Sequence, residues 1–496
     1  MERAPPKPSC RATRDLLYVL LVATLTSIAS FLAAHGGADA GARARDAQAR
    51  VRFAIPAILA RATAENPSRR IYTRILHARA ARAVESLGDG RTAPLFGVPV
   101  AIKDNIDVAG SETSCGRGGS VPAAAASAAI VERLESLGAI IIGKTNLDEA
   151  ALGASGRNPH FGRCANPRIK DRLSGGSSSG AAAAVAAGHV LLGIGTDTLG
   201  SVRIPAAFCG IVGFKPTHGR LSTAGVAPLY PRFDSVGLLA ASLTDIAYAA
   251  VLLLGEEVPP QFARDAVPHA GHDAVRRIAV LDDTALLEVD AEVAGRYRDC
   301  VALLAQARHI DRCAAPWLEW TAMARAAFWE VAHDFARCST GAGAPGYGAP
   351  GYGAPGYGAP GYGALGYRAL YDIEGELGRL LATAATRPAG KLADGRTLIQ
   401  QSVSRLTRCL DDAEAVLTPT CPQSAPSVHE DPVNHIAAFT APANAAGLPA
   451  VAWTQRIAAG GTLSLQLIGR PGADLRLIEL ASCVQRHLDS QNPLTI

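Results

Sequence analysis

The segment from residue 174 to 215 limits the possible folds of this chain more than any other. It is built almost entirely from small and apolar residues: SGGSSSGAAAAVAAGHVLLGIGTDTLGSVRIPAAFCGIVGFK. Residues 181–187 predict a tightly packed helix, and HVLLGIG predicts a strand that runs into a glycine turn. A flexible Gly/Ser linker is the alternative for GGSSSG, but apolar sequence follows closely, which favours a packed segment.

Helical and strand-like patterns alternate around this segment. Residues 127–138 predict a helix that ends at Gly138, and residues 139–146 (AIIIGKTN) predict a buried strand. GVPVAIKDNIDV predicts another buried strand that leads into a turn. Further predicted elements are a helical region at 43–85, a strand within 413–426 and a terminal helix at about 473–490. The alternation predicts an α/β fold with strands covered on both faces.

Composition excludes several classes of protein. Hydrophobic residues make up 48% of the chain of 496 residues and charged residues 19%, which excludes a mostly disordered protein. The net charge is +4 and no basic run stands out, so no nucleic-acid partner is expected. The ten cysteines form no CxxC pair, and a disulfide framework is unusual in so long a chain. We therefore expect buried free thiols in a reducing compartment, and a cytoplasmic protein.

Two segments stand apart from this core. Residues 16–34 are nearly all apolar, so they fit either a first helix docked on the protein or a signal or membrane anchor of an exported protein. We divide the chain into a tail with this apolar helix at 1–40 and one domain at 41–496. Residues 343–367 repeat GAPGY four times and then GALGY, which predicts an expanded surface loop. An adhesive or structural repeat is the alternative.

Lysine is scarce in this chain, with six residues, and Lys103 follows the apolar run PVAI. Burial lowers the pKa of a lysine, and the neutral amine is a competent base. Considered alone, Lys103 could also be a surface charge paired with Asp104 or Asp107. A serine nucleophile needs an adjacent base, and GGSSSG itself contains no histidine. Lys103 is therefore a candidate base for a serine.

Two other motifs fit the Gly/Ser segment less well. GSSSG matches the G-x-S-x-G motif of a nucleophile elbow, but RIKDRLS before it is a poor buried strand. The base would then have to be His429 or His435, and neither has a signature around it. Gly193, Gly195 and Gly200 have the spacing G-x-G-x-x-x-x-G, which differs from the G-x-G-x-x-G of dinucleotide-binding sites.

Three motifs in the right order make the chain resemble the amidase signature family of amide hydrolases. They are GVPVAIKDNIDV (97–108), GGSSSGAAAAVAAG (175–188) and GTDTLGSVRIPAAFCGIVGFKPTHGRLS (195–222). LTPTCP, FTAPANAAGLPAV and LSLQLIGRP match the closing segments of the family more loosely. The resemblance implies the amidase signature fold, a single domain with a large mixed β-sheet core flanked by helices on both faces.

The resemblance also implies a catalytic triad of two serines and a lysine. The catalytic lysine of the family corresponds to Lys103, its bridging serine with a cis peptide bond to Ser177, and its nucleophile to Ser201. The oxyanion that forms on the substrate needs hydrogen-bond donors. By resemblance these donors are four consecutive backbone N–H groups, those of Thr198, Leu199, Gly200 and Ser201.

The chain departs from the family pattern at two positions. Leu199 stands where glycine is more usual, and a leucine would be strained at positive φ. We expect Leu199 to adopt an ordinary conformation and to narrow the acyl pocket. Ala181 stands where the family often has serine, which affects a hydrogen bond near Ser177 and not the nucleophile. Asp197 and Arg203 flank the nucleophile, and we expect them to pair.

The resemblance implies acyl transfer on a small-molecule amide. Ser201 would attack a carboxamide, form an acyl-enzyme and release ammonia or an amine, with no metal or organic cofactor. Within the family, an A-type subunit of a glutamine-dependent amidotransferase and an enzyme similar to allophanate hydrolase are alternatives. A surface or binding protein that uses the GAPGY repeat is the alternative from another class.

Overall fold

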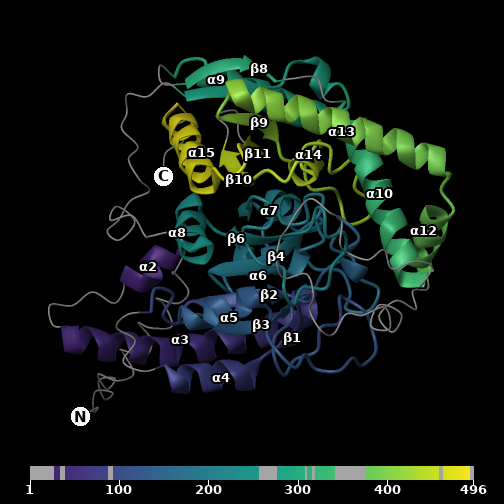
Figure 1. Cartoon of the computed structure of the whole chain (residues 1–496). Helices are drawn as coiled ribbons and strands as arrows, with labels where there is room; N and C mark the ends of the chain where they lie inside the picture. The colour runs from purple at the N-terminus through teal and green to yellow at the C-terminus, as the bar shows by residue number, and fades with distance from the viewer. Residues whose placement is uncertain are drawn as a thin grey trace, which may run out of the picture.

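The computed structural model describes residues 27–33, 40–87, 93–255, 276–307, 310–315, 319–340, 375–456 and 462–491. The strands in these residues are β1 Tyr72–Ile75, β2 Pro99–Lys103, β3 Ile140–Thr145, β4 Leu192–Asp197, β5 Val212–Lys215, β6 Ser235–Ala240, β7 Arg276–Val280, β8 Ile310–Ala314, β9 Ala415–Pro419, β10 Ala450–Arg456 and β11 Thr462–Gly469. They form one eleven-stranded sheet in the order β1-β3-β2-β4-β6-β5-β10-β11-β9-β7-β8. In Figure 1 the sheet extends from β1 near the bottom to β8 at the top.

The sheet is mixed. β2 lies parallel to β3 and β4, and β7 lies parallel to β8 and β9. The other neighbouring strands are antiparallel. Helices flank this sheet, and the predicted α/β class with a large mixed sheet is confirmed.

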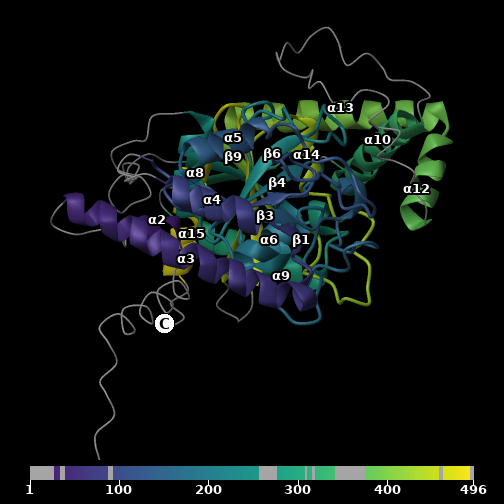
Figure 2. The same ribbon diagram turned by 90° about the horizontal axis from the view of Figure 1, so that it is seen from below.

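The helices pack on the sheet and on one another. Those in the described residues are α2 Ile28–Ala33, α3 Ala40–Arg69, α4 His77–Ser86, α5 Ala129–Ser136, α6 Ser179–Ala186, α7 Arg203–Cys209, α8 Leu243–Leu254, α9 Ala291–Leu304, α10 Trp320–Thr340, α12 Gly375–Ala385, α13 Ala389–Asp412, α14 Ala441–Ala445 and α15 Asp474–Ser490. α6 contacts β2 and β4, and α7 contacts β5 and β10. α8 and α15 contact each other, and α10 packs against α12 and α13 at the side of the molecule shown on the right of Figure 1. Figure 2 shows the same helical group projecting beside the sheet.

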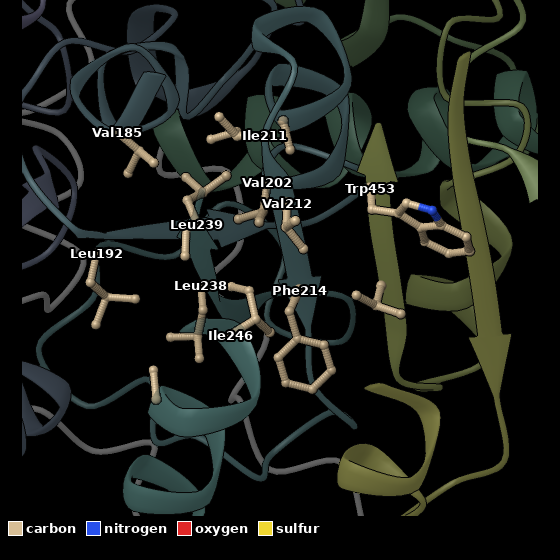
Figure 3. Close-up of a cluster of buried hydrophobic side chains, with 14 of the residues drawn as sticks. Val185, Leu192, Val202, Ile211, Val212, Phe214, Leu238, Leu239, Ile246 and Trp453 are labelled. Carbon is tan, nitrogen blue, oxygen red and sulfur yellow. The ribbon is translucent and has the colours of Figure 1, made fainter. Parts of the chain in front are cut away.

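The main core lies between the central strands and the helices that cover them. Figure 3 shows part of it, and the labelled side chains are at most 4% exposed. They come from α6, β4, β5, β6, α8 and β10 and from the links around α7, and they are Val185, Leu192, Val202, Ile211, Val212, Phe214, Leu238, Leu239, Ile246 and Trp453.

The small residues of α6 allow the close packing predicted for this helix. A Cβ on Gly180 would lie 2.3 Å from the carbonyl oxygen of Ile71, so any larger residue would push the helix away from the neighbouring chain. Four consecutive alanines, 181–184, are fully buried in the same helix. The helix therefore begins directly against the segment that carries β1.

Most of the predicted elements lie where the sequence places them: β2, α5, β3, α6, β4, β9 and α15. The prediction of a continuous helical region at 43–85 is wrong in one respect. α3 ends at Arg69, and the short strand β1 precedes α4. β1 has four residues and pairs antiparallel with β3 at the edge of the sheet, so it is too short for a period-2 pattern to reveal it.

The repeat at 343–367 and residues 16–26 lie outside the described residues. α2, the described part of the apolar N-terminal segment, packs against α8. Ile28 is fully buried, and its backbone N–H donates to Asp245 Oδ1 at 2.7 Å. Across the described ranges no helix is both long and apolar enough to cross a membrane.

The predicted reduced thiols are confirmed for seven cysteines. Five of them are buried, namely Cys115, Cys164, Cys209, Cys300 and Cys421. Cys409 and Cys483 are partly buried, and neither is in a disulfide.

Candidate active site

The candidate site lies where two parallel strands end side by side. β2 ends at Lys103 and β4 ends at Asp197, and the two strands pair through Val100–Leu192 to Ile102–Ile194. Because parallel strands end at the same edge of a sheet, residues just beyond them meet there. α6 and α7 begin at this edge, preceded by the segments that carry Ser177 and Ser201.

Lys103 is fully buried at this edge. Its Nζ lies 2.9 Å from Ser177 Oγ, 2.8 Å from Thr196 Oγ1 and 3.4 Å from the carbonyl oxygen of Thr196. The alternative of a surface charge paired with Asp104 or Asp107 does not fit this burial. Asp104 instead pairs with Lys144, at 2.8 Å between Oδ1 and Nζ.

Burial lowers the pKa of Lys103 to about 7, because the ammonium loses its hydration. The negative charges of Asp148, Asp197 and Asp234 oppose this effect and favour the protonated form. Near neutral pH, a substantial fraction of the Lys103 side chains is therefore uncharged. An uncharged amine can accept a proton, which an ordinary lysine at this pH cannot do.

The segments of the two serines are linked by hydrogen bonds. The peptide bond between Gly176 and Ser177 is cis, as the resemblance implies. The next residue, Ser178, donates its backbone N–H to the carbonyl oxygen of Ser201 at 3.0 Å and its hydroxyl to the carbonyl oxygen of Thr196 at 3.2 Å. Ser177 is fully buried, whereas Ser201 is partly exposed. The structure therefore gives Ser201, of the two, the access that a nucleophile needs.

Asp197 holds the turn between β4 and α7. Its carboxylate accepts the backbone N–H groups of Gly200 at 2.8 Å and Val202 at 3.1 Å. The predicted pairing with Arg203 is confirmed, at 2.8 Å between fully buried groups. Burial works against the charge on Asp197, but the Arg203 guanidinium holds the pKa of this carboxyl well below its usual range. Asp197 is thus a fixed anion that shapes the turn.

This turn differs from the expected oxyanion site at one residue. The N–H of Gly200 already donates to Asp197, so it does not point freely toward a substrate. Gly200 carries the unusual backbone conformation, with φ of +128°, and a Cβ there would lie 2.2 Å from Thr440 Oγ1. Leu199 lies outside the left-handed region, which agrees with the ordinary conformation expected for it.

Several polar residues of this site were not found from the sequence. Thr196 accepts from Lys103 and also from Asn105 Nδ2, at 3.1 Å. Asp234 accepts the hydroxyl of Thr198 at 2.6 Å. Asn444 donates to Asp197 Oδ1 at 2.8 Å. Asn444 lies in FTAPANAAGLPAV, where one polar amide in an apolar run was the available signal.

The elbow alternative has no support in this arrangement. The described segment between β3 and α6 contains no strand that leads into residue 176. His435 Nε2 lies 2.9 Å from the carbonyl oxygen of Glu288, and His429 is exposed. The lysine that contacts Ser177 is Lys103.

Comparison with known proteins identifies the family to which the chain belongs. A family model described as Amidase matches residues 54–336, a range that contains Lys103, Ser177 and Ser201. The chain belongs to the amidase family. The family predicted from the three motifs is thereby confirmed, and enzymes of this family act on amides.

Relatives of this amidase-family chain fall into more than one branch. It is 33% identical over 441 residues to the A-type subunit of the glutamyl-tRNA(Gln) amidotransferase of Symbiobacterium thermophilum, over 82% of this chain and 87% of that protein. It is 49% identical over 180 residues to the indoleacetamide hydrolase of Pseudomonas syringae pv. syringae, over 35% of this chain and 40% of that protein. A crystal structure of an amidase matches with a TM-score of 0.71 and 25% identity, over 90% of this chain and 99% of that one.

Proposed function

We propose that this protein hydrolyses a linear carboxamide, with Ser201 as nucleophile and Lys103 as the base that acts through Ser177. The observation that carries the proposal is the contact of 2.9 Å between Lys103 Nζ and Ser177 Oγ, made by a fully buried lysine. The pKa of about 7 for Lys103 supports the same role, because a base is most effective when its pKa lies near the working pH.

The contacts of Lys103 suit a neutral amine, which has two N–H groups and one lone pair. The hydroxyl and the carbonyl oxygen of Thr196 can accept the two N–H groups, at 2.8 Å and 3.4 Å. The lone pair is then directed to the third contact, the hydroxyl of Ser177. In this arrangement Ser177 donates its proton to Lys103 and accepts the proton of Ser201.

The reaction follows from this chain of donors and acceptors. Ser201 Oγ attacks the carbonyl carbon while its proton moves to Ser177 and the proton of Ser177 moves to Lys103. The C–N bond then breaks, and the proton on Lys103 returns through Ser177 to the departing nitrogen. Water attacks the acyl-enzyme along the same route, which releases the carboxylic acid and restores Ser201.

The oxyanion requires donors aimed at the carbonyl oxygen. We assign this role to the backbone N–H groups of Thr198, Leu199 and Ser201, since that of Gly200 is bound by Asp197. Two side-chain contacts support a fixed geometry here. Asp234 holds the hydroxyl of Thr198 at 2.6 Å, and Thr440 Oγ1 donates to the carbonyl oxygen of Leu199 at 2.6 Å.

Substitution of the two central residues tests the proposal. Ser201→Ala and Lys103→Ala should each abolish amide hydrolysis while the circular dichroism spectrum and the thermal unfolding remain those of a folded protein. A fluorophosphonate probe should label the native protein and not Ser201→Ala. Full activity in either variant would refute the assignment.

Lys215 provides a matched control for the loss of a buried lysine. It is also fully buried with its pKa lowered by burial to about 7, but its Nζ donates to the carbonyl oxygen of Pro216 at 2.8 Å. Lys103→Met should remove the activity. Lys215→Met should remain active, and the molecules that fold should show the pH profile of the native enzyme. Equal loss in both variants would mean that burial of a lysine, and not proton transfer, explains the effect.

A second candidate is the release of ammonia from glutamine for a partner protein. The observation that favours it is the similarity to the amidotransferase protein of Symbiobacterium thermophilum, which extends over 87% of that protein. Glutaminase activity, together with a partner that co-purifies with the protein, would support this role. Hydrolysis of simple amides by the purified chain alone would favour the independent amidase.

A further inference from the structure

A side chain from a distant part of the chain holds the start of the nucleophile turn, and the catalytic proposal does not use it. Asn444 lies in the short helix α14, 247 residues after Asp197, and is 1% exposed. Its Nδ2 donates to the backbone carbonyl oxygen of Asp197 at 2.9 Å, to Asp197 Oδ1 at 2.8 Å and to the carbonyl oxygen of Phe233 at 3.3 Å. One side chain thus contacts both the backbone and the carboxylate of the residue at which β4 ends.

The neighbours of Asn444 fix the orientation of its amide. Asn444 Oδ1 accepts from Arg203 Nη2 at 2.5 Å, while Nδ2 faces the oxygens of Asp197. A flipped amide would place N–H groups against the guanidinium and an oxygen against the carboxylate. The position therefore requires a side chain that carries a donor and an acceptor together, which the amide of asparagine does.

The contact with the carbonyl oxygen of Asp197 also determines where the N–H of Thr198 points. The two groups belong to one peptide unit, which is planar and trans, so the C=O and N–H bonds point in opposite directions. A donor that fixes the carbonyl oxygen of Asp197 therefore fixes the direction of the Thr198 N–H. This N–H is one of the three assigned to the oxyanion.

The other contacts of Asp197 act on its side chain. Its carboxylate accepts the N–H groups of Gly200 and Val202 and pairs with Arg203. These contacts shape the later part of the turn, whereas Asn444 acts on the peptide group that begins it. The two sets of contacts therefore have separate effects, which substitutions can distinguish.

From this geometry we infer that Asn444 is a positioning residue of the reaction. Through the peptide group shared by Asp197 and Thr198, its amide aims the Thr198 N–H at the oxyanion. The inference rests on the proposed function, since it assumes that Ser201 is the nucleophile and that the Thr198 N–H is a donor to the oxyanion.

Asn444→Ala in the full-length enzyme tests the inference through kcat and KM for a neutral amide. Loss of one oxyanion donor reduces kcat by about 100- to 1,000-fold, so a misdirected donor should reduce it by about 100-fold. KM should stay within about threefold of the native value, because the contact strengthens only in the transition state. A kcat within threefold of the native value in the folded variant would overturn the inference.

A trifluoromethyl ketone measures the same effect without turnover. Ser201 Oγ bonds to its carbonyl carbon, the serine proton moves through Ser177 to Lys103, and the ketone oxygen becomes the oxyanion. Its affinity should fall in Asn444→Ala by the same factor as kcat. Unchanged affinity would show that Asn444 does not act on the oxyanion donors.

Gln466 provides a matched control on the same guanidinium. It is fully buried, its Oε1 accepts from Arg203 Nη1 at 2.7 Å, and its Nε2 donates to Thr418 Oγ1 and to the carbonyl oxygen of Phe439. Gln466→Ala should lower stability but keep kcat within about threefold. Equal loss of kcat in the two alanine variants would mean that weakening of the cluster around Arg203, and not the aim of an N–H group, explains the effect.

A second pair of variants keeps the shape of the side chains, in case Asn444→Ala does not fold. Asn444→Asp keeps an oxygen for Arg203 but has no N–H for Asp197, and it should again lose about 100-fold in kcat. Gln466→Glu adds the same charge to the same guanidinium and should keep kcat within about threefold. Native kcat in Asn444→Asp would contradict the inference.

Fluorophosphonate labelling separates failure of the inference from failure of the proposed function. Labelling that depends on Ser201, combined with native kcat in the Asn444 variants, would leave the nucleophile in place and overturn only the role of Asn444. Absence of labelling and of hydrolysis in the native protein would overturn both.

Discussion

Thr196→Val changes one contact of the proposed base and keeps the shape of the side chain. The variant removes Oγ1, which lies 2.8 Å from Lys103 Nζ, while the carbonyl oxygen of Thr196 remains. Asn105 also loses a contact of 3.1 Å, but its Nδ2 keeps the carbonyl oxygen of Ala227 at 3.4 Å. The perturbation therefore acts mainly on Lys103.

The expected shift follows from the two charge states of the amine. A hydrogen bond to a charged group contributes about 1.5–3 kcal/mol and one between neutral groups about 0.5–1.5 kcal/mol. Loss of Oγ1 thus costs the ammonium about 1–1.5 kcal/mol more than it costs the neutral amine. Since about 1.4 kcal/mol corresponds to one pKa unit, the pKa of Lys103 should fall by about one unit from its value of about 7.

The assay is the pH dependence of kcat/KM for a neutral amide between about pH 5 and 9. The native enzyme should lose activity below pH 7, because protonation of Lys103 removes the base. In Thr196→Val this acid limb should lie about one unit lower, and the plateau should fall by roughly tenfold or more because the lone pair is no longer oriented. Thr196→Ser should restore both the position and the plateau. An acid limb that stays in place in Thr196→Val, or a native profile without one, would refute the assignment of Lys103 as the titrating base.

Three further predictions concern the framework of the site. Asp197→Asn should lower the free energy of unfolding by about 3–5 kcal/mol in urea titrations, because it leaves the buried guanidinium of its partner without a counter-charge; a loss below about 1 kcal/mol would contradict this. Gly200→Ala should reduce kcat by about 100-fold, because the new Cβ would collide with Thr440 Oγ1. The control is Gly219→Ala, which also lies at positive φ but has open space around it, and this variant should keep the native kcat. Between pH 7 and pH 10.5 the unfolded chain binds a proton at Lys103 that the folded chain does not, so this residue makes stability rise with pH by up to about 1.4 kcal/mol per unit. Lys103→Met should reduce that slope in unfolding measurements, and an identical slope would show that Lys103 is not neutral in the fold.

Local patterns predicted the elements that build the site. The apolar runs before Lys103 and before Asp197 gave β2 and β4, and the alanine-rich run gave α6. In each case consecutive small or apolar residues are buried on all sides, so the pattern alone carries the information. β1 was missed because four residues at a sheet edge carry too little pattern.

The chemical roles could not be derived from local patterns. Lys103, Lys144 and Lys215 all lie in the last residues of apolar strands and are all fully buried, so burial does not distinguish them. The motifs selected Lys103 by resemblance, and the contact with Ser177 appears only when β2 and the segment before α6 are brought together across 74 residues. Thr196 was missed for the same reason, since nothing in TDTLGS indicates which oxygen faces the lysine.

Two buried lysines on adjacent strands illustrate how the partner decides the chemistry. β2 and β3 pair in parallel, with Ile102 opposite Lys144, so the ends of both strands bring an amine into the interior. Lys144 forms an ion pair with the carboxylate of Asp104, at 2.8 Å between Nζ and Oδ1. Lys103 meets the oxygens of Thr196 and the hydroxyl of Ser177, which stabilise an ammonium far less.

The carboxylates around Lys103 are consistent with this difference between Lys103 and Lys144. Asp148, Asp197 and Asp234 all favour the charged form of Lys103 by their negative charge, yet burial still lowers the pKa of Lys103 to about 7. Each of these carboxylates accepts hydrogen bonds elsewhere: Asp148 from the backbone of residues 155 and 156, Asp197 from its guanidinium partner, and Asp234 from the segment before β6. They hold the loops around the site, and burial of Lys103 outweighs the effect of their negative charge on its pKa.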